Sequence, residues 1–298
     1  MDLKKPMTIE EQVDRLISHN MIIGDIDTAK KTLSEINYYR FSGYALQFRN
    51  KEHPDDYNAN TKFEDVLYLH NFDNRLRCVL RRFLDMVEIY ARMQIAYGFS
   101  HAKCLSAPHD QHYNPLNFHN EKSHNDIFNI SLDREKSNSK DALFVIHHAN
   151  KYSGKMLLWV IVELMSFTNL SKLYNAMYFS EQDSIAKNVG TGRDILRNHL
   201  HCLANLRNKI AHAGRLYNIT YNPPVNLGWK YRKNNPDIAQ NTLFAYIIAL
   251  LRRLPNKIDR MALVVELSDI LGSRAECVEI SRLGFPYDYQ RILNNEIE

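Results

Sequence analysis

Glycine, proline and cysteine are all scarce in this chain. Ten glycines and nine prolines among 298 residues leave few positions that would break a helix. The four cysteines form no CxxC pair, which argues against a disulfide framework and fits a reducing compartment. The longest apolar runs, such as MLLWVIVELM, are about half of the ~20 residues that a spanning helix needs. We therefore expect a cytoplasmic protein with no membrane partner, and the charged start MDLKKPMTIEEQ predicts no signal peptide.

The chain does contain hydrophobic residues at helical spacing, and these predict an all-α protein. Apolar side chains recur every three or four residues from Phe63 to about Gly98, which indicates one unusually long amphipathic helix. A second amphipathic helix is predicted from Thr191 to Gly214, with Gly214 as the C′ glycine just after its end. Its expected buried stripe consists of Ile195, Leu196, Leu200, Leu203, Leu206 and Ile210.

Polar and proline-containing segments separate the predicted helices. Residues 104–140 predict a loop-rich insert with one short helix, and the proline pair in YNPPVNLGWKYRKNNP predicts a non-helical segment. Near the start, Thr8 and Glu11 have the spacing of a capping box. We expect an N-terminal helical segment at 1–60 packed on a helical core at 61–222, followed by a C-terminal helical segment at 223–298.

The most one-sided basic segment, residues 187–215, carries six bases against one acid, Asp194. Inside it, the stretch LANLRNKIAHAGRLYN places Arg207, Asn208 and His212 near the end of the predicted helix. These residues form either a solvated helix end or a site that acts on phosphate. Arg and His are common at helix C-termini because they suit the helix dipole, so the spacing alone does not decide between the two.

Helix geometry limits how the three side chains can cooperate. At about 100° per residue, Asn208 and His212 lie on nearly one face, whereas Arg207 lies roughly 140° round from His212. A single straight helix therefore does not point Arg207 and His212 into one pocket. The two converge if the helix ends near His212, or if a symmetric dimer brings two Arg and two His into one cleft.

Such a cleft would suit cleavage of RNA without a metal ion. A histidine titrates near neutral pH, so it can take the proton from the ribose 2′-OH that attacks the adjacent phosphate. An arginine can bind the phosphate bidentately and stabilise the charge of the transition state. An asparagine can orient the histidine or donate to a phosphate oxygen. The expected products are a 2′,3′-cyclic phosphate and a 5′-hydroxyl.

The stretch RNKIAHAGRLYN resembles the RN-x3-H motif of HEPN-domain ribonucleases, in particular that of Abi-like abortive infection proteins, the AbiD/AbiF group of bacterial phage-defence proteins. The further blocks similar to that family, in the same order, are KPMTIEEQVDRLISHNMII, INYYRFSGYALQFR, HHANKYSGKMLLWVIVELMSFTNLSKLY and RLGFPYDY. The resemblance covers nearly the whole chain. It implies an all-α HEPN-type helical bundle with additional N- and C-terminal helices, and an endoribonuclease toxin whose catalytic Arg207, Asn208 and His212 meet across a homodimer.

The resemblance also implies partners. RNA is the expected substrate, a regulatory non-coding RNA is a second expected partner, and no cofactor or metal ion is expected. The alternative is a non-catalytic RNA-binding module associated with a small non-coding RNA. Some HEPN toxins are neutralised by modification of a Tyr two residues after the His, and Gly214 at that position argues against such regulation here.

This chain departs from the family pattern at two places. SFTN stands where relatives often have SFG, so a turn after Phe167 differs, and Ala213-Gly214 stands where relatives often carry a second polar residue after the His. The second departure bears on the level of activity and on substrate preference.

Cations and aromatic rings around the motif are candidate RNA contacts. Those on and just after the motif helix are Arg193, Arg197, His201, Lys209 and Arg215. Those in the downstream WKYRK stretch are Trp229, Lys230, Tyr231, Arg232 and Lys233. A further row on the long helix predicts either RNA contacts or a solvated face partly paired with Asp73, Asp85 and Glu88. That row consists of Arg75, Arg77, Arg81, Arg82 and Arg92.

Other polar residues have less specific patterns. A stretch rich in His is interpreted as exposed loop histidines in preference to a metal site, and it comprises His101, Cys104, His109, His112, His119 and His124. Glu163 lies in an apolar segment, so we expect a buried carboxylate with an arginine partner.

Overall fold

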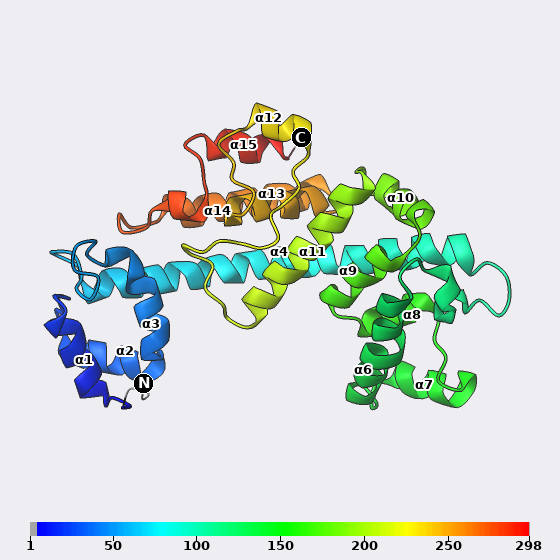
Figure 1. Cartoon of the computed structure of the whole chain (residues 1–298), viewed down its shortest axis with the longest axis horizontal. Helices are drawn as coiled ribbons and strands as arrows, with labels where there is room; N and C mark the ends of the chain where they lie inside the picture. Colours follow the sequence, from blue (N-terminus) through cyan, green and yellow to red (C-terminus); the bar gives the residue numbers. More distant parts are fainter. Residues whose placement is uncertain (1–4, 298) are drawn as a thin grey trace. The chain divides into compact units, whose positions relative to one another are not determined.

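The computed structural model describes residues 5–297, and all regular structure in that range is helical (Figure 1). The described residues contain no β-strand, and three isolated bridges join single residue pairs. The predicted all-α class is confirmed. Within the same range, no helix is both long and apolar enough to cross a bilayer.

The chain divides into two compact units. The N-terminal unit comprises Met1–Cys78 and Asp269–Ile280, and the main unit comprises Val79–Ser268 and Ser281–Glu298. Three elements contribute residues to both units: α4 (Phe63–Lys103), α14 (Lys257–Gly272) and the short turn η5 (Ile280–Leu283). The division expected at residues 60 and 222 stays a prediction.

The N-terminal unit begins with three short helices that precede α4. They are α1 (Ile9–Ser18), α2 (Ile26–Glu35) and α3 (Tyr38–Ala45), followed by the turn η1 (Leu46–Phe48). The predicted capping box is confirmed, because Thr8 Oγ1 accepts from the N–H of Glu11 at 3.2 Å and Glu11 Oε2 accepts from the N–H of Thr8 at 2.8 Å. The core of this unit includes the rings of Phe41 and Phe63, stacked with their centroids 4.5 Å apart.

A buried polar cluster joins α3 to the first part of α4. The hydroxyl of Tyr44 donates to Asp73 Oδ2 at 2.6 Å, and Arg77 pairs with the same carboxylate. Arg77 is only 6% exposed, so this member of the arginine row is neither on a solvated face nor available to RNA. The ion pair offsets the cost of burying both charges.

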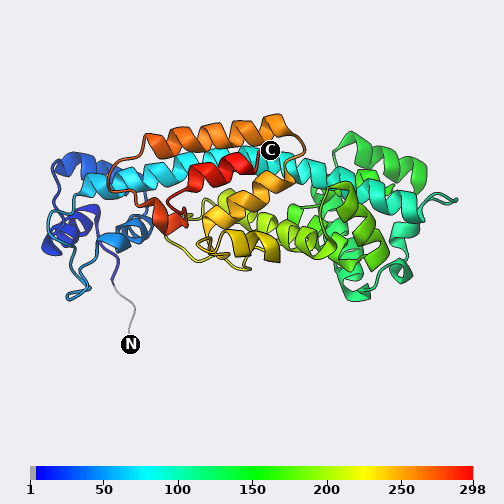
Figure 2. The same cartoon turned by 90° about the horizontal axis from the view of Figure 1, so that it is seen from above.

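The main unit holds most of the helices. In chain order they are α5 (Glu121–Asn125), α6 (Leu132–Asn138), α7 (Leu143–Tyr152), α8 (Leu158–Leu164), α9 (Phe167–Ala176), α10 (Phe179–Asn188), α11 (Arg193–Ala211), α12 (Trp229–Asn234), α13 (Leu243–Arg253) and α15 (Tyr289–Asn295). Figures 1 and 2 both show α14 running beside α4 within this unit, where Arg82 of α4 pairs with Glu266 of α14. A second member of the arginine row therefore has an acidic partner.

α11 lies in the middle of the main unit and packs against α9, α10 and α13. The predicted stripe is buried at Leu196, Leu200, Leu203, Leu206 and Ile210, and Ile195 is half-buried. Every residue of α13 from Leu243 to Leu251 is also buried. The helix that carries the motif is thus held by apolar contacts with three other helices, and removing this apolar surface from water stabilises the packing.

α4 is longer than the sequence predicts, because Gly98 lies inside the helix and not at its end. A Cβ at this position would come within 2.4 Å of Ile185 Cγ1 on α10. Glycine is present because α10 packs directly onto the α4 backbone, and the helix continues to Lys103.

Residues 104–140 are more ordered than the predicted loop-rich insert. Two 3₁₀ turns, η2 (Gln111–Tyr113) and η3 (Pro115–Asn117), precede α5. A π-helical turn, η4 (Asp126–Ser131), then joins α5 to α6, so that helix runs without a break from Glu121 to Asn138. The sequence does not predict this helix clearly, because it contains few buried apolar residues. They are Ile127, Phe128 and Leu132.

Candidate functional site

The motif helix α11 spans Arg193–Ala211, so the helix predicted over Thr191–Gly214 ends earlier than expected. His212 is the C-cap residue, with φ −88° and ψ 18°, and its N–H donates to the carbonyl of Asn208 at 3.0 Å. Beyond it, the N–H of Ala213 donates to Ile210 O at 3.0 Å and the N–H of Gly214 to Lys209 O at 2.7 Å. These two bonds are those of a Schellman cap, which satisfies carbonyls that the helix end leaves unpaired.

The predicted role of Gly214 as the C′ residue is wrong by one position. Ala213 takes the left-handed conformation, with φ 52°. A glycine is needed at position 214 because the backbone there passes close to Lys209. A Cβ would lie 2.9 Å from the carbonyl oxygen of Lys209 and 2.7 Å from its Cγ.

Arg207 is held by a buried acid on another helix. Its Nε lies 3.2 Å from Oε2 of Glu88, which is 2% exposed on α4. The other carboxylate oxygen of Glu88 accepts from Arg92 Nη2 at 2.7 Å. Arg92 in turn donates from Nε to the carbonyl of Val162 at 2.9 Å and from Nη2 to that of Met165 at 3.1 Å. One carboxylate thus connects the motif arginine to α4 and to the end of α8.

Asn208 is held by a different helix, α9. Its Nδ2 donates to Oγ1 of Thr168 on α9 at 2.9 Å. The amide is therefore already engaged within the chain, which favours a positioning role for Asn208 over direct contact with phosphate. Thr168 is the second residue of α9, which begins at Phe167.

His212 is the exposed member of the three. Its side chain faces solvent and makes no hydrogen bond or ion pair with any residue in the described range 5–297. In that range no such interaction joins Arg207 to His212 either. Arg207 and Asn208 thus have partners on α4 and α9, respectively. The imidazole of His212 is accessible to solvent or to a bound molecule.

The flanking cations on α11 differ in their surroundings. Arg193 pairs with Asp183 at 3.1 Å and lies over the ring of Phe179, and Arg197 pairs with Asp194 at 2.9 Å. His201 is exposed. The remaining two, Lys209 and Arg215, are half-buried near the helix end.

The WKYRK stretch is a helix, contrary to the non-helical segment predicted there. The proline pair lies upstream of α12, which begins at Trp229 and therefore avoids it. Trp229 is 70% exposed and lies 5.5 Å from Lys233 Nζ. Tyr231 is half-buried beneath the Arg252 guanidinium at 4.1 Å, whereas Lys230, Arg232 and Lys233 are exposed.

Two of the histidines interpreted as exposed loop residues are buried. His112 donates from Nε2 to the carbonyl of Met156 at 2.9 Å, and His124 donates from Nε2 to the carbonyl of His112 at 3.0 Å. Cys104 Sγ lies 3.8 Å from His112 Nδ1. Burial lowers the pKa of His112 to about 4, so the ring is neutral at physiological pH. These side chains join the insert to the rest of the main unit.

The described residues contain no group of three or more His, Cys, Asp and Glu side chains placed to hold a metal ion. His199, on α11 itself, is also buried: it donates from Nε2 to the carbonyl of Asn226 at 3.0 Å, and burial lowers its pKa to about 3. It therefore serves packing, whereas His201 two residues later faces outward.

The expectation that Glu163 is a buried acid is wrong, because Glu163 is exposed on α8. The short α8 turns this residue outward and buries Leu158, Ile161 and Val162 instead. The buried acid of the site is Glu88. Its four-residue spacing from Arg92 is the sequence signal for it, whereas nothing local in the sequence marks Thr168.

The model of the Abi-like protein family matches residues 31–218, a span that includes α11 with Arg207, Asn208 and His212. The chain belongs to the Abi-like protein family. The resemblance to Abi-like proteins is confirmed over residues 31–218, and membership of this family indicates a role in abortive infection, a form of defence against phage. No curated protein and no solved structure matches the chain.

Proposed function

We propose that this Abi-like protein is a metal-independent endoribonuclease effector whose active site is built by two copies of α11. The observation that carries the proposal is the contrast at the end of this helix. Arg207 is fixed by the buried carboxylate of Glu88, whereas His212 is exposed at the C-cap, five residues later. A fixed cation and an accessible imidazole are the two groups that metal-independent cleavage of RNA requires.

In the proposed reaction His212 accepts the proton of a ribose 2′-OH. The 2′ oxygen then forms a bond to the adjacent phosphorus, and the bond from phosphorus to the 5′ oxygen of the next nucleotide breaks. The leaving 5′ oxygen takes up a proton, supplied by a second imidazole or by water. Arg207 stabilises the extra negative charge on the phosphate in the transition state. The products are a 2′,3′-cyclic phosphate and a 5′-hydroxyl.

A dimer is proposed because one chain does not supply a complete pocket. Within a chain the guanidinium of Arg207 is directed to α4, whereas His212 is directed to solvent. A two-fold axis near the end of α11 would place His212 of one copy near Arg207 of the other, since an isologous interface repeats each contact twice.

The test uses purified protein and an end-labelled RNA in buffer with EDTA. We expect cleavage by the wild type, with cyclic phosphate ends, and loss of at least about a hundredfold in rate for Arg207→Ala and His212→Ala. His147→Ala is the matched control, because it removes an exposed imidazole on α7, outside the proposed site, and it should leave the rate as in the wild type. Salt-dependent RNA binding without cleavage would instead identify a non-catalytic RNA-binding module.

A further inference from the structure

A polar groove lies along α11 on the side that faces α9. Its volume is about 540 Å³, within the range of sites that hold small organic ligands. One wall is α9 and the other is α11, and Pro223 and Asn226 of the segment before α12 complete the lining. The groove lies wholly within the main unit.

On each helix the residues that line the groove are three or four positions apart, or adjacent to such a position, and so lie along one face. The α9 stripe consists of Thr168, Ser171, Lys172 and Asn175, and the α11 stripe consists of Asp194, Arg197, Asn198, His201 and Ala204. At a rise of 1.5 Å per residue, the α11 stripe is about 15 Å long. The groove is thus an elongated channel that follows α11.

The channel is connected to the motif through Thr168. This residue lines the groove, and its hydroxyl accepts from Asn208 Nδ2 at 2.9 Å. Asn208 also continues the α11 stripe, since it follows Ala204 by four residues and precedes His212 by four. A chain molecule lying in the groove would therefore lead toward the exposed imidazole.

Several polar groups of the groove have no partner in the described part of the chain. They are the hydroxyl of Ser171, which is 8% exposed, the side-chain amide of Asn175, the ammonium of Lys172 and the imidazole of His201. The hydroxyl of Ser171 keeps accessible surface, so water or a bound molecule can form its hydrogen bond. Together these groups offer both hydrogen-bond donors and hydrogen-bond acceptors to a ligand.

The segment before α12 is held against the groove by hydrogen bonds. Asn198 accepts at Oδ1 from the N–H of Asn226 at 2.6 Å and donates from Nδ2 to the carbonyl of Pro224 at 3.0 Å. Tyr246 donates to the carbonyl of Pro223 at 2.6 Å. A site that is already shaped loses less free energy on binding, so these bonds favour a ligand.

We propose that this groove binds nucleotides of single-stranded RNA that flank the scissile phosphate. Lys172 supplies positive charge for the backbone phosphates, and Arg197 adds charge that its ion pair with Asp194 in the same lining reduces. Asn175, Ser171 and His201 supply hydrogen bonds and one planar ring for an unstacked base. The lining contains no large apolar side chain, which disfavours a protein helix as the occupant. The proposal rests on the ribonuclease function proposed above.

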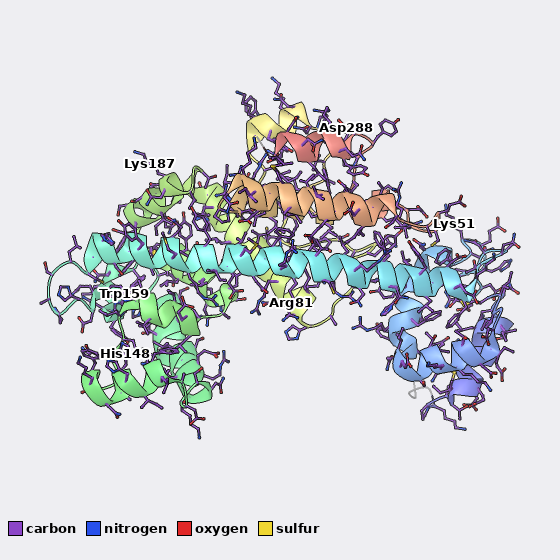
Figure 3. All side chains as sticks on the ribbon, turned by 180° about the vertical axis from the view of Figure 1, so that it is seen from behind. Lys51, Arg81, His148, Trp159, Lys187 and Asp288 are labelled. Atoms are coloured by element: carbon purple, nitrogen blue, oxygen red, sulfur yellow. The ribbon has the colours of Figure 1, made fainter. Side chains whose placement is uncertain are left out.

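The test measures binding separately from cleavage. A labelled 2′-O-methyl RNA, which has no 2′-OH to attack, is titrated with full-length protein at two salt concentrations. Lys172→Glu is compared with Lys187→Glu, which makes the same change on the exposed face of α10 (Figure 3). We expect Lys172→Glu to weaken binding by at least about tenfold and to reduce the salt slope, and Lys187→Glu to change affinity less than twofold. Equal effects of the two variants would overturn the proposal.

Two further measurements separate the outcomes. If the wild type cleaves ordinary RNA and Lys172→Glu binds and cleaves as well as it does, the groove proposal fails while the ribonuclease function stands. If no cleavage occurs but Lys172→Glu loses binding, the groove is supported and the ribonuclease function fails. The mass in solution is measured for both variants, and loss of a dimer only in Lys172→Glu would show that copies meet at this face, which overturns the proposal.

Base contact is tested with Asn175→Ala. We expect this variant to reduce the difference in affinity among oligonucleotides of different base, because an amide that reads a base edge is removed. An undiminished difference would overturn the assignment of Asn175 to the base.

Discussion

Arg207 Nε lies 3.2 Å from Oε2 of Glu88, a carboxylate that is 2% exposed. Because Glu88 also accepts from Arg92 at 2.7 Å, one buried acid fixes two cations. The side chain of Arg207 is itself 36% exposed, so a phosphate can reach part of it. Glu88 is therefore a positioning residue for the proposed active site.

Replacing Glu88 by Gln should reduce RNA cleavage by about 10–100-fold, because a misplaced arginine stabilises the transition state less well. Asp85→Asn, which alters an exposed acid one turn earlier on α4, is the matched control. The initial rates of RNA cleavage by both variants are measured in EDTA, and circular dichroism verifies that each variant is folded. Unchanged rates in a folded Glu88→Gln variant would show that the contact with Arg207 has no role in catalysis.

Thr168→Val tests the anchor of Asn208. The change keeps the size of the side chain and removes the acceptor of the 2.9 Å hydrogen bond. We expect a loss of about 0.5–1.5 kcal/mol in the free energy of unfolding and a lower cleavage rate. Thr220→Val, on an exposed threonine outside the groove, should leave both values as in the wild type. Urea titration and initial rates measure the two effects, and identical behaviour of both variants would count against the anchor.

Gly98→Ala tests the contact between α4 and α10. The added methyl group would lie 2.4 Å from Ile185 Cγ1, so the helices must separate, at an expected cost of about 1–3 kcal/mol. In Gly272→Ala, the control at the end of α14, the new Cβ meets no atom within 4 Å. Thermal unfolding should show a lower Tm for the first variant only. An equal or higher Tm for Gly98→Ala would mean that the helices do not pack as closely as described.

The buried histidines predict a loss of stability in mild acid. Burial lowers the pKa of His112 to about 4 and that of His199 to about 3, whereas an unfolded histidine titrates near 6.5. Between these values the unfolded chain binds more protons, so the stability contributed by each neutral ring is complete above about pH 6.5 and falls as the pH is lowered toward the folded pKa. Urea unfolding at pH 7.5 and 5 should show this loss, and a flat profile would contradict it.

The matched pair for that experiment is His112→Gln and His147→Gln. The first removes a buried titrating ring, and the second removes an exposed one on α7. His112→Gln should be less stable at pH 7.5 but lose less stability on acidification, whereas His147→Gln should follow the wild type.

The helical class and the buried stripe of α11 were predictable because they depend on local pattern. The stripe follows from hydrophobic spacing, whereas the end predicted at Gly214 lies beyond the last helical residue, Ala211. Gly98 and Gly214 were misjudged because a close contact with a distant or neighbouring atom, and not a helix end or a left-handed turn, is what requires glycine there. Local pattern cannot separate these reasons.

The partners of the motif could be predicted only in part. Glu88 and Arg92 form an i, i+4 pair that the sequence displays, but their connection to Arg207 depends on how α4 packs against α11. The bond from Asn208 to Thr168 links residues 40 positions apart. The same reason explains the buried histidines: His112 finds its acceptor at Met156, which no spacing rule indicates.

The most direct test of the composite site is complementation between two inactive variants. Arg207→Ala and His212→Ala chains, each with a different affinity tag, are co-expressed and purified through both tags, and RNA cleavage is measured in EDTA. If Arg207 of one copy acts with His212 of the other, each homodimer is inactive and the mixed dimer regains about half of the wild-type rate, since one intact pair remains. A mixed dimer as inactive as either homodimer would contradict a site built from two copies of α11.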